Sequence, residues 1–112
     1  MKRGLSLDQI EEVSDRVQLM LSNLTPQEVA NVMYRIYHDR YLYNGDTWFV
    51  FTDLHWVKVT SLREWIEVDF VKEVTFYTSL LNKYNTHNIA PTLHDPDFQK
   101  VLLEELRRVF YD

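Results

Sequence analysis

Cysteine is absent from this chain of 112 residues, and glycine and proline are scarce, with two and three residues. The absence of cysteine excludes a disulfide framework and a thiolate metal site. The two glycines, Gly4 and Gly45, lie far apart in the sequence. The chain therefore has neither a glycine-rich loop that could wrap a phosphate nor the Gly-x-Ser-x-Gly turn that presents a serine nucleophile.

Long apolar runs are also missing. No stretch reaches the ~20 apolar residues that a membrane span needs, and no apolar run follows Lys2 and Arg3 as a secretion signal requires. The four histidines are scattered, and none pairs with another at the i, i+4 spacing of a helical metal site. Carboxylate pairs such as Glu104 and Glu105 fall on amphipathic helices, where a solvated face is the expected meaning. We predict a soluble intracellular protein that is not an enzyme and needs no metal or cofactor.

The composition is that of a folded chain. Apolar residues make up 46% of it and aromatic residues 14%, which is enough to form a core, and the length fits one domain over residues 1–112. The net charge of −5 disfavours a DNA-binding surface over the whole molecule, because affinity for phosphate comes largely from lysine and arginine. A local basic patch remains compatible with this balance.

Helix start signals are well marked in the first third of the chain. Ser6 and Gln9 form a capping-box pattern that predicts a helix over residues 7 to about 22. Thr25-Pro26 combines an N-cap hydroxyl with proline at the first helical position, and it predicts a second helix to about His38. The apolar positions of this second helix repeat at three and four residues: Val29, Val32, Met33, Ile36 and Tyr37.

Two more helices are predicted in the second half. Ser61 opens the longest one, which is expected to reach about Tyr84 and to be the central core element, because its apolar arc is wide and includes Phe76. Residues 85–94 lose all periodicity and are predicted as a surface loop. Asp95-Pro96 then begins a final helix that runs to the chain end.

Residues 41–59 change to a period of two and are rich in aromatic and β-branched types. Asn44 and Gly45 predict a tight hairpin turn after the first strand, and a second turn at residues 52–55 precedes the third strand. Alternation leaves both faces of this sheet apolar. The sequence therefore predicts an α+β fold of four helices, with a three-stranded antiparallel β-meander between helices two and three, in a winged-helix-like order.

A candidate nucleic-acid surface follows from that order. In winged helix-turn-helix domains a helix enters the major groove and the hairpin after it touches the backbone, and exposed tryptophans can stack on bases. The alternatives are that the cations complement the dipole of the second helix and that the tryptophans pack in the core or across strands. The candidate residues are Arg35, Arg40, Trp48, Trp56, Lys58 and Arg63.

The order of several short runs carries a resemblance. The runs are residues 29–41, the sequence TWFVF at 47–51, HWVKV at 55–59, SLR at 61–63, LEEL at 103–106 and the closing FYD at 110–112. In this order they resemble the small helicase-associated domain that precedes the superfamily 3 helicase core in the poxvirus-type primase-helicases of large DNA viruses and phages. The resemblance covers most of the chain from about residue 26.

The resemblance implies service in viral DNA replication, at the replication site in the host cell. The partner would be a superfamily 3 helicase or primase module, in cis or in trans, with single-stranded or forked DNA as a further candidate. The ATP-site and primase residues of that family are absent, so no catalytic residue is carried over. We expect either a domain excised from a longer protein or a stand-alone relative. The alternative function is a viral or phage accessory protein that acts as a protein interaction domain, with self-association through exposed aromatic residues.

Overall fold

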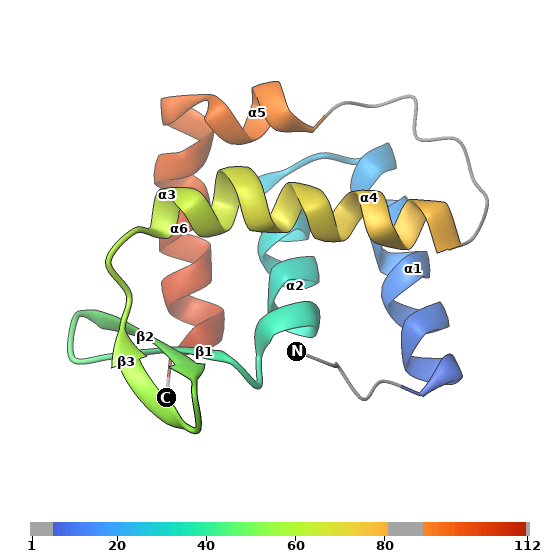
Figure 1. Ribbon diagram of the computed structural model, residues 1–112. Helices are drawn as coiled ribbons and strands as arrows, with labels where there is room; N and C mark the ends of the chain where they lie inside the picture. The colour runs from blue at the N-terminus through green and yellow to red at the C-terminus, as the bar shows by residue number, and fades with distance from the viewer. Residues whose placement is uncertain (1–5, 81–88, 112) are drawn as a thin grey trace.

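Three helices lie side by side and a longer helix crosses them in the computed structural model, which describes residues 6–80 and 89–111 (Figure 1). In the described part, α2 lies between α1 and α6 and contacts both, while the crossing helix packs on α1. A short helix, α5, precedes α6 and contacts the crossing helix. The helices are α1 (Leu7–Ser22), α2 (Pro26–Tyr37), the crossing helix α3–η1–α4 (Leu62–Glu64, Trp65–Asp69 and Phe70–Leu80), α5 (Ala90–His94) and α6 (Pro96–Phe110).

The predicted helix starts are confirmed by their capping bonds. The Ser6 hydroxyl accepts from the Gln9 backbone N–H at 3.2 Å, and the Gln9 side chain accepts from the Ser6 N–H at 2.8 Å. The Thr25 hydroxyl accepts from the third backbone N–H after it at 3.2 Å, and Ser61 forms the equivalent bond at 3.4 Å. Asp95 caps α6 through its carboxylate. Local chemistry therefore fixes where these helices begin.

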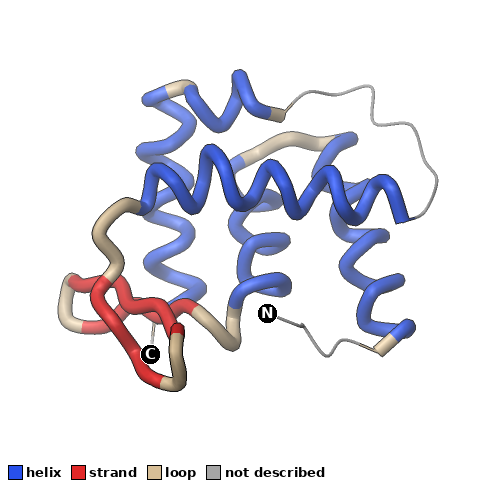
Figure 2. Tube along the Cα trace, viewed as in Figure 1, coloured by secondary structure: helices blue, strands red, loops and turns tan. Residues whose placement is uncertain are grey.

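A three-stranded antiparallel sheet follows α2, and the strands gather at one end of the molecule (Figure 2). Its order is β1 (Tyr41–Asn44), β2 (Thr47–Thr52) and β3 (His55–Lys58). The predicted α+β class and the meander between α2 and α3 are confirmed. Both α2 and α6 run towards this sheet and end beside it (Figure 1), and Tyr111 forms a parallel bridge with Tyr43 on the free edge of β1.

The first hairpin turn lies one residue later than predicted. Asn44 pairs with Thr47 as the last residues of the two strands, so the turn residues are Gly45 and Asp46, with φ of 57° and 63°. Aspartate tolerates the left-handed region better than most residues. The Tyr43 hydroxyl also donates to the Asp46 carboxylate at 3.1 Å, a bond that the predicted register did not anticipate.

The second hairpin turn holds a strained leucine. Asp53 and Leu54 have φ of 50° and 68°, and Leu54 is 90% exposed at the tip. The left-handed region favours glycine and asparagine over leucine. The Leu54 side chain is not part of the core, so no core packing offsets the backbone strain of this conformation. The hairpin therefore exposes an apolar side chain to solvent on a strained turn.

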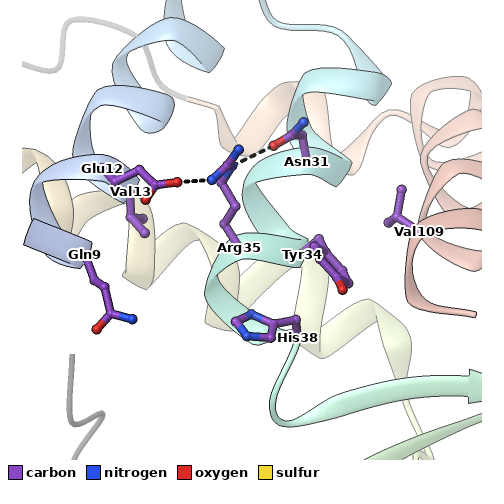
Figure 3. A pocket seen from close by; sticks show the side chains of 8 residues that line it. All are labelled: Gln9, Glu12, Val13, Asn31, Tyr34, Arg35, His38 and Val109. Carbon is purple, nitrogen blue, oxygen red and sulfur yellow. Dashed lines mark hydrogen bonds and ion pairs between the residues drawn. The ribbon is translucent and has the colours of Figure 1, made fainter. Parts of the chain in front are cut away.

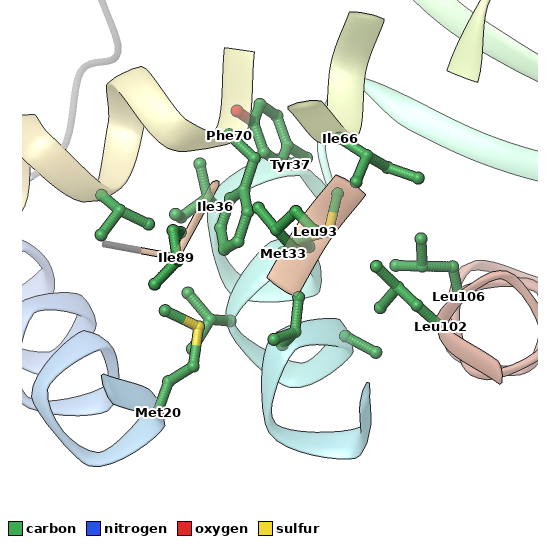
Figure 4. Close-up of a cluster of buried hydrophobic side chains, with 14 of the residues drawn as sticks. Met20, Met33, Ile36, Tyr37, Ile66, Phe70, Ile89, Leu93, Leu102 and Leu106 are labelled. Carbon is green, nitrogen blue, oxygen red and sulfur yellow. The ribbon is translucent and has the colours of Figure 1, made fainter. Parts of the chain in front are cut away.

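The core runs through the middle of the helical layer, and α2 is its centre (Figure 4). All six of its buried side chains are at most 5% exposed, and Met20 of α1, Phe70 of α4 and Leu102 of α6 pack from the surrounding helices. A recognition helix must offer one face to the groove of DNA. The structure does not confirm the winged-helix arrangement, because the helix in the recognition position lies between α1 and α6 at the centre of the core and leaves only a narrow side exposed.

Trp65 joins the sheet to the helices. Its ring, 1% exposed, stacks in parallel on Tyr41 of β1 with a centroid distance of 3.9 Å. Trp48 of β2, Tyr37 of α2 and Phe110 of α6 meet it edge-on at 5.4–5.5 Å. One side chain therefore contacts four elements, and it sets the position of the sheet against the ends of α2 and α6.

The crossing helix differs from the predicted regular helix. Its apolar stripe repeats every four residues at Leu62, Ile66, Phe70 and Val74, a spacing that drifts around an α-helix of 3.6 residues per turn. The π-helical segment Trp65–Asp69 absorbs this drift with a wider turn and keeps the stripe on the core. Phe76 does not widen the core, because it is 48% exposed.

The predicted surface loop at residues 85–94 is wrong in its described part. Residues 81–88, which include the expected end of the third helix, lie outside the described residues. From Ala90 the chain forms α5, which has Pro91 in its first turn. Ile89 and Leu93 are spaced by four and are buried at 2% and 0% exposure. This short apolar pair was missed because it is flanked by polar and turn-forming residues, and the described residues contain five helical bodies instead of four.

Candidate binding groove

A groove runs along the exposed side of α2 and onto the sheet. It consists of two adjoining cavities of about 470 Å³ and 260 Å³ that share Tyr34, His38 and Val109 in their walls. The larger cavity lies against α1, and the smaller one lies between β1, β3 and the ends of α2 and α6. We call them the α1 half and the sheet half; Figure 3 shows the α1 half.

Tyr34 and His38 form the ridge between the two halves. They are one turn apart on α2, and their rings lie 5.5 Å apart. Tyr34 is 43% exposed and rests edge-on against Phe110 at 5.2 Å. The buried stripe of α2 occupies the opposite side of the helix, so the α2 residues that line the groove are ones that the core does not use.

The α1 half contains polar side chains that bond to one another (Figure 3). Arg35 forms an ion pair with Glu12 of α1, and its Nε donates to the Asn31 side-chain oxygen at 3.0 Å. This arginine was predicted to contact DNA. In the structure its guanidinium is already partnered by a carboxylate, which reduces its capacity to neutralise a phosphate.

The sheet half is largely aromatic, and none of the described residues that line it is a lysine or an arginine. Its walls include Trp56 of β3, 43% exposed, and Tyr111, 72% exposed. Burial, with the Asp69 carboxylate nearby, raises the pKa of the Tyr41 phenol, so this wall residue stays neutral at physiological pH. Asp39, two residues after the end of α2, supplies a carboxylate at the edge. The arrangement suits a ligand with an apolar or flat cationic group.

The six predicted site residues do not form one surface. Trp48 is buried in the core and contacts Tyr43, Trp65 and Phe110, which leaves it no free face for a base. Trp56 lies in the sheet half of the groove, and Arg35 lies in the α1 half. The groove therefore unites only these two members of the predicted set.

The other three predicted cations point to different places. The Arg40 guanidinium lies 5.0 Å from the centroid of the Tyr37 ring. Arg63 donates to Glu67 at 2.9 Å within the crossing helix. Lys58 is exposed, and it shares the outer face of the sheet with Phe49, its cross-strand partner. Of these three and within the described residues, Lys58 is the cation with no hydrogen bond, ion pair or ring contact of its side chain.

A second polar cluster fastens α5 to its neighbours. Glu67, with a side chain 7% exposed, accepts from Gln99 at 2.6 Å and contacts His94 of α5 at 2.7 Å. The hydrogen bond from Gln99, followed by that from Arg63, lowers the pKa of Glu67. A lowered pKa means that the ionised Glu67 carboxylate stabilises the fold at pH values above the ordinary carboxyl pKa, and that this stabilisation is lost as the pH falls through the lowered pKa. We therefore assign this cluster a structural role.

Sequence reasoning missed Tyr34, Asp39 and Tyr111. One signal was available for Tyr34, because an aromatic residue on the polar side of an amphipathic helix is unusual. No comparable local signal marks Tyr111, which reaches the groove only because α6 ends beside β1.

Among the described residues, no group of three histidine, aspartate or glutamate side chains could hold a metal ion. None of the described helices combines the length and apolar character needed to cross a membrane. Comparison with known proteins finds no matching family model, no matching curated protein and no matching solved structure. The resemblance to primase-helicases thus stays a prediction.

Proposed function

We propose that this chain is a non-catalytic docking module that assists DNA replication by assembling with a helicase or primase module, in cis or in trans. The observation that supports docking is the groove, whose sheet half exposes Trp56, Tyr34 and Tyr111 together. Exposed tryptophan and tyrosine are the residue types that dominate binding energy at protein interfaces. The sequence resemblance supplies the partner class, a superfamily 3 helicase.

Complex formation with the superfamily 3 helicase of the same genome tests this proposal. In size-exclusion chromatography with light scattering, the two proteins are expected to elute together, and the chain alone reports its own oligomeric state. Trp56→Ala is expected to weaken the complex by about 2 kcal/mol, roughly 30-fold, as truncation of an aromatic anchor does.

Phe76→Ala is the matched control, because Phe76 is 48% exposed against 43% for Trp56 but does not line the groove. It is expected to leave the affinity unchanged. Absence of any complex with the helicase or its primase module would reject the proposed partner class. Equal weakening by both substitutions would reject the groove as the docking site.

Direct contact with single-stranded DNA is a second candidate, supported by the outer face of the sheet. The register places Phe49, Phe51 and Trp56 on one face with Lys58, and aromatic side chains beside a cation can stack bases and neutralise phosphate. This face contributes nothing to the core, and the Phe51 and Trp56 rings lie 5.3 Å apart.

Lys58→Glu is expected to abolish weak, salt-sensitive binding of labelled oligothymidylate in fluorescence anisotropy. Loss of one phosphate contact lowers the slope of log affinity against log salt by about 0.7. Arg35→Glu is expected to have a smaller effect, because Arg35 already pairs with Glu12. If the unmodified chain shows no anisotropy change at low salt, direct DNA contact is excluded and docking remains.

A further inference from the structure

The backbone makes the sheet half of the groove electronegative. Both α2, which ends at Tyr37, and α6, which ends at Phe110, place their last turns at this cavity. The carbonyl groups of a last helical turn carry partial negative charge, and they favour a cation nearby. Tyr111 leaves α6 in an extended conformation, with φ of −59° and ψ of 130°.

One carboxylate in this cavity is unpaired. Asp39 is exposed in the wall, and within the described residues its side chain has no hydrogen bond or ion pair. Three arginines near the two helix ends are engaged elsewhere: Arg35 pairs with Glu12, Arg108 with Glu105, and Arg40 lies over the Tyr37 ring. Arg107, in the last turn of α6, lies near Tyr43 and does not line the cavity. Among the described residues, the Asp39 carboxylate beside the two helix ends therefore has no ion-pair partner.

The remaining walls suit a flat cation. Tyr34, Trp56 and Tyr111 are exposed aromatic residues of the wall, and the face of an aromatic ring attracts positive charge through its quadrupole. A cavity of about 260 Å³ accommodates one long side chain. The chain itself uses this contact next to the groove, where the Arg40 guanidinium lies 5.0 Å from the Tyr37 ring centroid.

We infer that the sheet half of the groove binds the guanidinium of an arginine carried by an extended segment of the partner protein. This inference rests on the proposed docking function and names the side chain that the groove recognises. The guanidinium stacks between the aromatic walls and donates to Asp39. Arginine fits better than lysine because its planar group can stack and donate two parallel hydrogen bonds to a carboxylate. An anionic ligand is disfavoured by the helix ends, by Asp39 and by the net charge of −5.

A titration of the ¹⁵N-labelled full chain tests the inference by NMR. The probe is the peptide acetyl-Gly-Gly-Arg-Gly-Gly-amide, and the control peptide carries citrulline, which has the same shape without the charge. The arginine peptide is expected to shift the indole N–H resonance of Trp56 and to leave those of the buried Trp48 and Trp65 unchanged. The citrulline peptide is expected to have an affinity at least about tenfold lower, since the cation contributes most of the attraction.

Two variants locate the site. Asp39→Asn is expected to weaken the arginine peptide about tenfold, whereas Asp53→Asn, at an exposed turn that does not line the groove, is expected to have no effect. Equal responses to the arginine and citrulline peptides, a lysine peptide that binds as tightly, or no shift at Trp56 would each overturn the inference. Because the titration contains no helicase, it fails or succeeds separately from the test of the proposed partner.

Discussion

Replacing Trp65 with alanine is expected to lower the free energy of unfolding by about 3–5 kcal/mol. The side chain is 1% exposed and contacts aromatic rings of α2, β1, β2 and α6. Its removal leaves a cavity where the sheet meets the helices, and the parallel stack on Tyr41 is lost. Because domains of this size are stable by only about 5–15 kcal/mol, this change removes a large part of the total.

Guanidinium denaturation followed by far-ultraviolet circular dichroism measures the effect. Trp65→Phe is the conservative control and is expected to cost less than half as much, because the Trp65 indole N–H has no hydrogen-bond partner in the described structure and phenylalanine keeps an aromatic ring there. Trp56→Ala, on the exposed outer face, is expected to cost less than about 1 kcal/mol. A Trp65→Ala midpoint close to that of Trp56→Ala would show that the sheet is held without this contact.

Local chemistry predicted most of the secondary structure. The caps at Ser6, Thr25 and Asp95 need only a side-chain oxygen at a fixed distance from a backbone N–H, so a single sequence reveals them. The α5 helix depends instead on burial of Ile89 and Leu93 under the crossing helix and α6. The contact with the crossing helix joins segments distant in the sequence, and one apolar pair spaced by four is too short a local pattern to predict it.

The candidate site was predictable only in part. Trp56 was identified as a binding residue from its type, but Trp48 carried the same signal and lies in the core. Both faces of the sheet are apolar, so alternation could not decide which one faces the helices. The packing of Trp65 decides this, because it contacts Trp48 and Tyr41 and so turns the face that carries them towards the helices.

Replacing Phe110 with alanine is the second change expected to have a large effect, with a loss of about 3–5 kcal/mol in the free energy of unfolding. Phe110 is 3% exposed and contacts Trp48 and Trp65 in the core and Tyr34 in the groove. Phe110 therefore connects the core with the groove. At a temperature where the variant is still folded, the arginine peptide is also expected to bind more weakly, because Tyr34 loses its support.

Tyr111→Ala is the matched control, at the adjacent position. Tyr111 is 72% exposed and lies outside the core, so its removal is expected to change stability by less than about 1 kcal/mol while it weakens peptide binding through loss of an aromatic wall. Thermal unfolding and the Trp56 indole shift together separate the two effects. If Tyr111→Ala lowered stability as much as Phe110→Ala, the Tyr111 side chain would contribute to the core, and its exposure could no longer be attributed to binding.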